Sequence, residues 1–187
     1  MHQRLGDLIS HLIDAKLDAL VITGPANWYY LTGFTGESGA LVVSRKETTL
    51  ITDGRFLVQG RTETSGVRIR QQKGSLFDSV GEFIKNSRCV RVGFNPTQVT
   101  VGQLHTLRKT SGARARWFPA AGMPERLRMR KDRAELAQMR RAGEKAKLTA
   151  ARDEKPDVTM RRQGRRAAAQ DRDFGVAHRK AAQVRLA

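Results

Sequence analysis

The chain has 187 residues, of which 39% are hydrophobic, and a chain of this length supports one substantial core rather than two domains. No apolar run approaches the roughly 20 residues that cross a bilayer, and the N-terminal segment lacks the features of a secretory signal, so we expect a cytoplasmic protein with no membrane partner. The formal net charge of +17 arises from 35 Lys and Arg against 18 Asp and Glu, and it favours contact with polyanions through counterion release.

An amphipathic helix is predicted at the N-terminus. Its apolar residues recur at spacings of three and four, and they are Leu5, Leu8, Ile9, Leu12 and Ile13. Such a stripe must cover another apolar surface, which we expect to be a β-sheet.

Six short β-rich runs predict the strands of that sheet. They are residues 19–23, 39–43, 48–52, 67–70, 90–93 and 115–118. The second and third runs are joined by four polar residues, 44–47, and so short a connection predicts an antiparallel pair.

Amphipathic helices are predicted between the later strands, after Ser75 and after Thr100, which are typical N-cap residues. Alternation of helices and strands with one hairpin indicates an α/β fold: a mixed sheet of about six strands with helices on both faces. We assign this domain to residues 1–125.

The composition changes after this domain. Asp132 and Glu135 have the spacing of a capping box and open a helix with a thin apolar face, so we expect a linker helix over residues 126–150. Residues 151–187 are expected to form an irregular basic tail, because ten basic and five acidic residues follow position 151 with only isolated large apolar side chains.

Several motifs occur in a characteristic order. Asn27 begins a turn that leads into a Y-L-T-G-F segment at residues 30–34, and a T-D-G-R-F segment follows at residues 52–56. Residues 127–135 read L-R-M-R-K-D-R-A-E. Together these motifs resemble the N-terminal domain of the creatinase/prolidase family, which includes Xaa-Pro aminopeptidases, and the resemblance runs from about Arg4 to Lys147.

The resemblance implies a non-catalytic domain that acts as a lid and an oligomerisation surface. In intact relatives two divalent metals, Mn, Co or Zn, are held by carboxylates and a histidine of a later catalytic domain. No such ligand set occurs here, so we assign no catalytic residue, metal ligand or cofactor, and we expect a truncated or frame-shifted product that is inactive alone. The single cysteine, Cys89, is expected to be buried and unreactive.

The resemblance also implies a candidate substrate gate or interface in the loop of residues 34–39. Its members are Phe34, Gly36, Glu37 and Ser38, with Asp53 and Arg55 as bracing residues. Each also has a structural explanation, since aromatic residues anchor cores and Asp accepts backbone hydrogen bonds at turns. The expected partners are a second copy of the chain or a catalytic domain.

An alternative function is nonspecific binding of nucleic acid by the basic linker and tail. Four arginines, Arg161, Arg162, Arg165 and Arg166, are candidates for phosphate contacts. A solvated cationic surface explains the same charge equally well, because no stacking aromatic cluster accompanies it.

Overall fold

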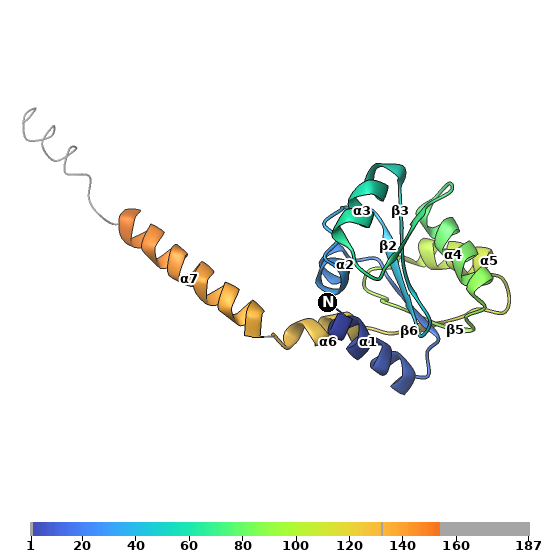
Figure 1. The fold of residues 1–187 in the computed structure, drawn as a ribbon. Helices are drawn as coiled ribbons and strands as arrows, with labels where there is room; N and C mark the ends of the chain where they lie inside the picture. Colours follow the sequence, from blue (N-terminus) through green and yellow to red (C-terminus); the bar gives the residue numbers. More distant parts are fainter. Residues whose placement is uncertain (1, 132, 154–187) are drawn as a thin grey trace, which may run out of the picture. The chain divides into compact units, whose positions relative to one another are not determined.

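The computed structural model describes residues 2–131 and 133–153 (Figure 1). The chain divides into two compact units, residues 1–130 and residues 131–187, which are described separately below. Of the expected irregular tail, residues 151–153 are helical instead, and residues 154–187 lie outside the described residues. Among the described residues, no helix is both long and apolar enough to cross a membrane.

The first unit is built on a six-stranded mixed sheet, as predicted. Its strand order is β4-β3-β2-β1-β5-β6. The β1/β2 and β2/β3 pairs are antiparallel, whereas the β3/β4, β1/β5 and β5/β6 pairs are parallel. The strands are β1 (Ala19–Ile22), β2 (Ala40–Ser44), β3 (Thr48–Thr52), β4 (Arg68–Gln71), β5 (Arg91–Phe94) and β6 (Arg116–Pro119).

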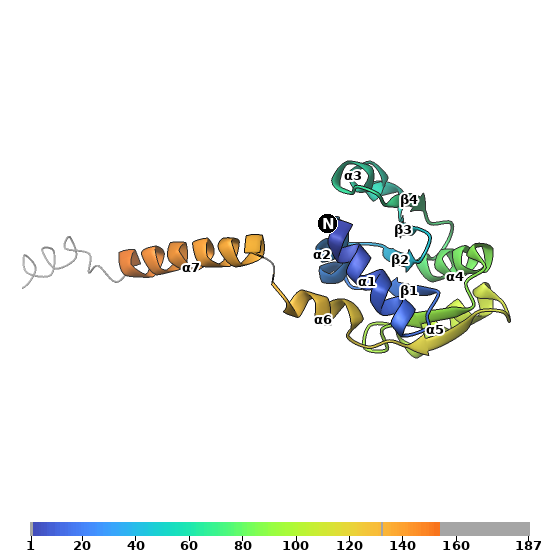
Figure 2. The same cartoon turned by 60° about the horizontal axis from the view of Figure 1, so that its bottom comes forward.

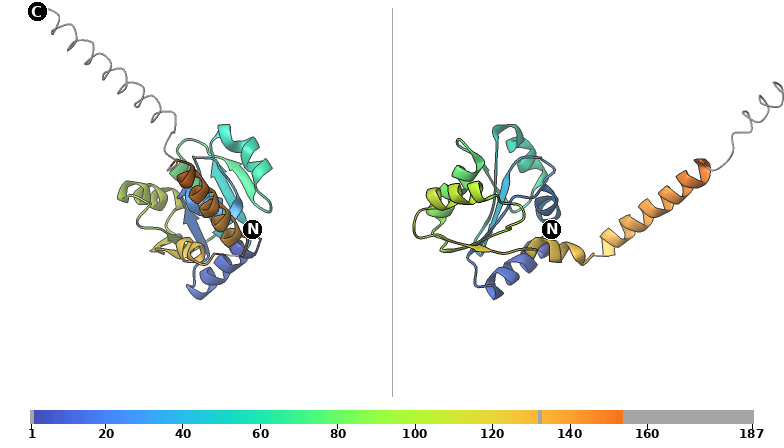
Figure 3. Two further views of the ribbon diagram at one scale, coloured as in Figure 1. Left: turned by 90° about the vertical axis from the view of Figure 1, so that its left-hand side faces the viewer. Right: turned by 180° about the vertical axis from the view of Figure 1, so that it is seen from behind.

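Helices cover both faces of this sheet, which also confirms the predicted fold class (Figures 1 and 3). The helices of the first unit are α1 (His2–Asp14), α2 (Pro25–Thr32), the 3-10 turn η1 (Gly54–Phe56), α3 (Leu57–Glu63), α4 (Leu76–Ser87), α5 (Val101–Ser111) and α6 (Met123–Met129). Helices α4 and α5 pack side by side on one face, and α3 packs beside β4 at the edge of the sheet (Figure 2).

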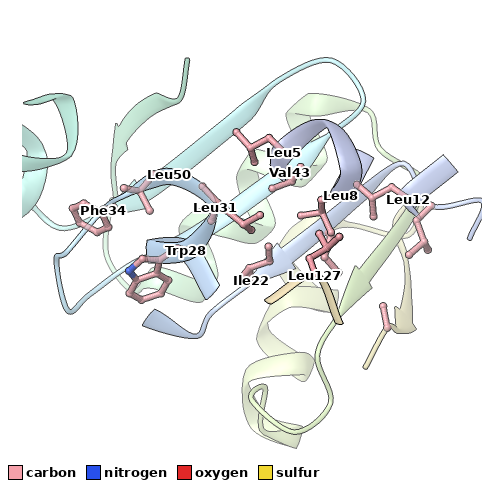
Figure 4. Close-up of a cluster of buried hydrophobic side chains, with 14 residues drawn as sticks. Leu5, Leu8, Leu12, Ile22, Trp28, Leu31, Phe34, Val43, Leu50 and Leu127 are labelled. Carbon is pink, nitrogen blue, oxygen red and sulfur yellow. The ribbon is translucent and has the colours of Figure 1, made fainter. Parts of the chain in front are cut away.

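Two cores result from the alternation of side chains along the strands. Leu20, Leu41 and Leu50 face the core shared with α1, α2 and α6. Figure 4 shows Leu50 in this core with Leu31 and Leu127. Their neighbours Val21 and Val42 face the opposite core, which α4 and α5 cover. Strands β1 and β2 are buried on both faces, which explains why these two runs are almost wholly apolar rather than alternating.

The predicted N-caps of α4 and α5 are present. The Ser75 hydroxyl accepts from the Asp78 amide at 3.2 Å, and Thr100 forms a reciprocal capping box with Gln103. Each cap satisfies a backbone donor that the first helical turn leaves without a partner.

Two local expectations were wrong. Ile13 is 51% exposed, because the buried face of α1 is formed by Leu5, Leu8 and Leu12 and does not include Ile13. Asn27 lies inside α2 rather than in a turn: Pro25 fits the first turn of this helix, and Gly33 ends it with a φ of 80°.

The expected linker helix over residues 126–150 is divided in the structure. Helix α6 ends at Met129, and Arg130 adopts an extended backbone with a φ of −90° and a ψ of 103°. Leu127 is buried in the core of the first unit, so α6 is part of the sheet domain.

The second unit contains α7 (Arg133–Asp153), a helix of 21 residues. Its Leu136 and Met139 side chains are exposed, as are the cations Arg140, Arg141 and Lys145. The predicted capping box at Asp132 falls outside the described residues.

Candidate functional site

The candidate residues from two parts of the sequence lie together at one end of the β2/β3 hairpin. The 34–39 loop leads into β2, and Asp53 and Arg55 follow β3. Because β2 and β3 are antiparallel, with Ala40 opposite Ile51, the start of one strand adjoins the end of the other. The Thr52 hydroxyl donates to the Ser38 carbonyl at 2.5 Å and ties the two segments together.

A buried aromatic cluster packs against the 34–39 loop on the side that faces the core. Phe34 is fully buried, and its ring centroid lies 6.3 Å from that of Trp28 and 6.2 Å from that of Phe56. The Trp28 indole donates to the Gly36 carbonyl at 3.2 Å (Figure 4 shows Trp28 and Phe34). Phe34 therefore anchors the loop in the core and does not present its ring at the surface.

Gly36 permits a close approach that no other residue allows. A Cβ atom at this position would lie 2.2 Å from the Cζ atom of Phe34, far inside van der Waals contact. The glycine thus lets the backbone fold directly over the buried ring.

Glu63, at the end of α3, fixes the exposed side of the loop. Its two carboxylate oxygens accept from the Thr35 amide at 2.8 Å and from the Thr35 hydroxyl at 2.7 Å. Gln59, one turn earlier, donates to the Thr35 hydroxyl at 2.7 Å and to Glu63 at 3.0 Å. The Thr35 amide, followed by its hydroxyl, holds the pKa of Glu63 below its usual value.

Sequence reasoning missed Glu63 as part of this site and did not single out Thr35 within the candidate loop. The available signal was the spacing of four residues between Gln59 and Glu63, which places both on one side of a helix. Nothing local to Thr35, 28 residues earlier, indicates which helix it meets.

Asp53 and Arg55 form an ion pair beside the loop. Asp53 caps η1 by accepting from the Arg55 amide at 2.9 Å, and it also accepts from the Arg55 guanidinium Nη2 at 2.9 Å and Nε at 3.2 Å. The Arg55 side-chain hydrogen bond is the main cause of a lowered pKa at Asp53. The same bond raises the pKa of Arg55, and the nearby Glu37 carboxylate adds a smaller effect.

The Arg55 side chain remains 78% exposed despite this pair. Its Nη1 atom has no acceptor in the described part of the chain, and Glu37 is exposed nearby. The surface of the site therefore offers a braced guanidinium that can contact an external carboxylate, in a geometry fixed by Asp53. No group of three His, Cys, Asp or Glu side chains arranged to hold a metal occurs within residues 2–131 and 133–153.

A second polar cluster lies where β1 and β5 end, and it holds α6. Glu125 Oε1 accepts from Asn27 Nδ2 at 2.8 Å and from Asn95 Nδ2 at 3.1 Å, and Arg128 donates to Asn27 Oδ1 at 3.1 Å. Both asparagines are buried. Asn27, one of the motif residues, thus has a structural role that links distant parts of the sheet domain.

The remaining predicted binding residues, Arg161, Arg162, Arg165 and Arg166, lie outside the described residues. Cys89 is only partly buried and packs against the core under α4 and α5.

Comparison with known proteins identifies the same domain. The model of the creatinase/prolidase N-terminal domain matches residues 4–130. The uncharacterized peptidase YqhT of Bacillus subtilis is 30% identical over 120 residues, which are 64% of this chain and 34% of that protein. The chain therefore spans about a third of the length of this curated relative.

Solved structures give the same result. The N-terminal domain of the cytoplasmic peptidase PepQ from Mycobacterium tuberculosis has a TM-score of 0.63 and 26% identity, over 67% of this chain and 98% of that chain. The Xaa-Pro dipeptidase from Bacillus anthracis has a TM-score of 0.68 and 26% identity, over 73% of this chain and 38% of that chain. On the extent of the sequence match and the shared six-stranded fold, the chain belongs to the creatinase/prolidase N-terminal domain family.

Proposed function

We propose that this domain serves an Xaa-Pro peptidase-like active site carried by a catalytic domain or by a second chain. In this role the 34–39 loop limits access to that site, and Arg55 contacts a carboxylate of the peptide or of the partner. Family membership supports the proposal, and the observation that carries it is the Arg55 guanidinium, exposed but held by Asp53.

The organisation of the site is suited to such a role. A loop that limits access to an active site must keep its conformation when different peptides bind. Binding groups are most effective when the residues that position them are rigid. Phe34 and Gly36 fix the loop from the core, and Glu63 fixes it from α3. The hydrolytic chemistry itself belongs, in this proposal, to metal ions of the catalytic part, and we assign none of its steps to this domain.

A chimera tests the proposal directly. Residues 4–130 would replace the matching N-terminal part of the Bacillus anthracis Xaa-Pro dipeptidase, and hydrolysis of an Xaa-Pro dipeptide would be measured with added Mn²⁺. We expect activity in the chimera, and a rise in KM of about tenfold on Arg55→Ala, because a charge-assisted hydrogen bond to the substrate or partner is lost.

The matched control is Arg61→Ala, which removes an exposed arginine of α3 that makes no ion pair in the described chain. We expect this variant to keep the KM of the chimera. Equal kinetics for the two variants would contradict the role of Arg55, and hydrolysis by the purified 187-residue chain alone would contradict a non-catalytic domain.

A second candidate function is nonspecific binding of nucleic acid, which the exposed cations of α7 favour. Contacts to several phosphates make affinity fall steeply with salt, so the binding of a short DNA duplex would be titrated at 50 and 200 mM NaCl. A change of less than twofold in affinity would argue against it. A cytoplasmic location is part of the main proposal, supported by the description of PepQ as a cytoplasmic peptidase.

A further inference from the structure

A separate pocket lies at the opposite end of β2 from the 34–39 loop. It is formed between the β2/β3 connection and the turn that follows α4, and it has a volume of about 630 Å³. This volume is within the range of roughly 300–1,000 Å³ that is typical of small-molecule sites. The charged residues that line the pocket are Asp18, Arg45, Lys46, Glu47, Arg68 and Arg88.

Both carboxylates of this pocket already have partners. Asp18 accepts from the backbone amides of Val90 and Arg91 at 3.0 and 2.9 Å, and its carboxylate lies 4.0 Å from the Arg45 guanidinium. Glu47 forms an ion pair with Arg68 at 2.8 Å. The two carboxylates that line the pocket are therefore largely neutralised by arginines and backbone amides of the protein itself.

Two cations of the pocket remain without an anionic partner. In the described part of the chain, neither the Lys46 ammonium nor the Arg88 guanidinium forms an ion pair. The C-terminal end of α4 adds only a partial negative charge beside them. The net field in the pocket is therefore positive.

Arg88 is unusual in its backbone as well as in its charge. It terminates α4 with a φ of 59° and a ψ of 18°, in the left-handed region where glycine is the common residue. A side chain in this conformation is strained, and its presence places a guanidinium at the pocket in a position that glycine would fill more easily.

We propose that this pocket binds the phosphate group of a small phosphorylated molecule, with Lys46 and Arg88 as the residues that contact the anion. Arginine offers a planar set of donors and lysine a compact charge, a combination suited to a tetrahedral oxyanion. The volume leaves room for the organic part of the ligand beside Cys89 and Val90. This site is independent of the proposed gate, because its residues lie at the other end of β2.

The chain provides a closely matched pair of variants for the test. Arg88→Gly removes one positive charge and relieves the left-handed strain, so the variant is expected to fold at least as well as the original protein. Lys16 is the second non-glycine residue with a positive φ among the described residues, at 55°, and it does not line the pocket. Lys16→Gly therefore makes the same change in charge and backbone freedom elsewhere.

The experiment measures phosphate binding to the full chain and to both variants. Inorganic phosphate and pyrophosphate would be titrated by calorimetry against chloride at equal ionic strength. The alkylation rate of Cys89 by iodoacetamide provides a local readout, since this residue lines the pocket and is the single cysteine of the chain. We expect phosphate to slow alkylation in the original protein and in Lys16→Gly, and Arg88→Gly to weaken binding about tenfold or more.

Three outcomes would overturn the proposal. Equal affinities of Arg88→Gly and Lys16→Gly would mean that phosphate responds only to the overall positive charge of the chain. An alkylation rate of Cys89 that phosphate does not change would place any binding outside this pocket. A third variant, Lys46→Gln, must weaken binding as Arg88→Gly does, and unchanged affinity in that variant would also contradict the assigned contacts.

Discussion

Gly36 is the residue of the candidate site at which the structure leaves no room for a larger side chain. An added methyl group would overlap the ring of Phe34, which is fully buried between Trp28 and Phe56. We predict that Gly36→Ala lowers the free energy of unfolding by about 1–3 kcal/mol, because overpacking forces the ring or the loop to move. Urea denaturation followed by circular dichroism measures this loss.

A glycine in open space provides the control. Gly6 lies within α1, and a Cβ atom there would meet no other atom within 4 Å. Gly6→Ala should raise stability by about 0.5–1 kcal/mol, since alanine has the higher helix propensity. If the two variants had the same effect, the close approach at Gly36 would have no energetic importance.

We expect protonation of Glu63 at low pH to lower the stability of the folded protein. Its hydrogen bonds from Thr35 lower its pKa in the folded protein, so the folded state binds this proton less readily than the unfolded chain does. The corresponding stability is present above the ordinary pKa of glutamate in the unfolded chain and is lost as the pH falls through the lower pKa of the folded state. We predict that Glu63→Gln has a shallower loss of stability than the original protein in this acid range.

Urea midpoints measured between pH 7 and pH 2.5 test this prediction. Asp18 and Asp53, whose pKa values are also lowered, will maintain part of the acid sensitivity in both proteins. Glu82→Gln is the control, because Glu82 is exposed and makes no hydrogen bond in the described chain. If the pH curves of the two variants coincided, the bonds from Thr35 would not account for the effect.

At the scale of elements, one carboxylate joins α6 to two buried side chains of the sheet domain. Glu125 Oε1 accepts from both Asn27 and Asn95, and these amides are buried beneath it. We predict that Glu125→Ala lowers the free energy of unfolding by about 1–3 kcal/mol, since buried donors lose their acceptor. Chemical denaturation measures the loss, and amide exchange in α6 should become faster than in the strands.

Glu125→Gln separates the acceptor from the charge. Glutamine keeps one carbonyl oxygen for the two asparagines, so we expect it to lose less stability than the alanine variant. A glutamine variant as unstable as the alanine variant would indicate that the negative charge near Arg128, rather than the shared acceptor, holds this helix.

The elements that sequence predicted well are those whose signals are local. Strand positions follow from runs of apolar residues, and the starts of α4 and α5 follow from Ser75 and Thr100, whose caps act within three residues. Helix α2 was missed because it is short and mostly apolar around its circumference, so it has no stripe to detect. The spacing of Asp132 and Glu135 predicted a helix start close to that of α7 at Arg133, but the separate helix α6 was missed because no proline or glycine marks its end at Arg130.

The candidate site was only partly predictable for the same reason. Asp53 and Arg55 are two residues apart, and the sequence singled out both as bracing residues but did not predict that they pair with each other. The bonds of Thr35 to Glu63 and of Asn27 to Glu125 join residues 28 and 98 positions apart. Such pairs depend on the register of the whole sheet, which a single sequence does not specify.

At the scale of the molecule, the described cores lie wholly within residues 1–130. Every buried apolar residue of both cores comes from this unit, the last being Leu127. We predict that a fragment of residues 1–130 folds alone and that its free energy of unfolding is within about 0.5 kcal/mol of that of the full chain. A fragment that stops at residue 121 should be several kcal/mol less stable, because it loses the burial of Leu127 and the bonds of Glu125.

The two tryptophans allow the cooperativity of this unit to be measured. Trp28 is buried in the core under α1 and α2, and Trp117 is buried in the core under α4 and α5. Because the two cores share the strands of one sheet, loss of either core should disrupt the other, so Trp28→Phe and Trp117→Phe fragments should each unfold in a single transition. Within each variant, the fluorescence midpoint should coincide with the circular dichroism midpoint. A fluorescence transition clearly earlier than the circular dichroism transition in one variant would mean that the two faces of the sheet unfold separately.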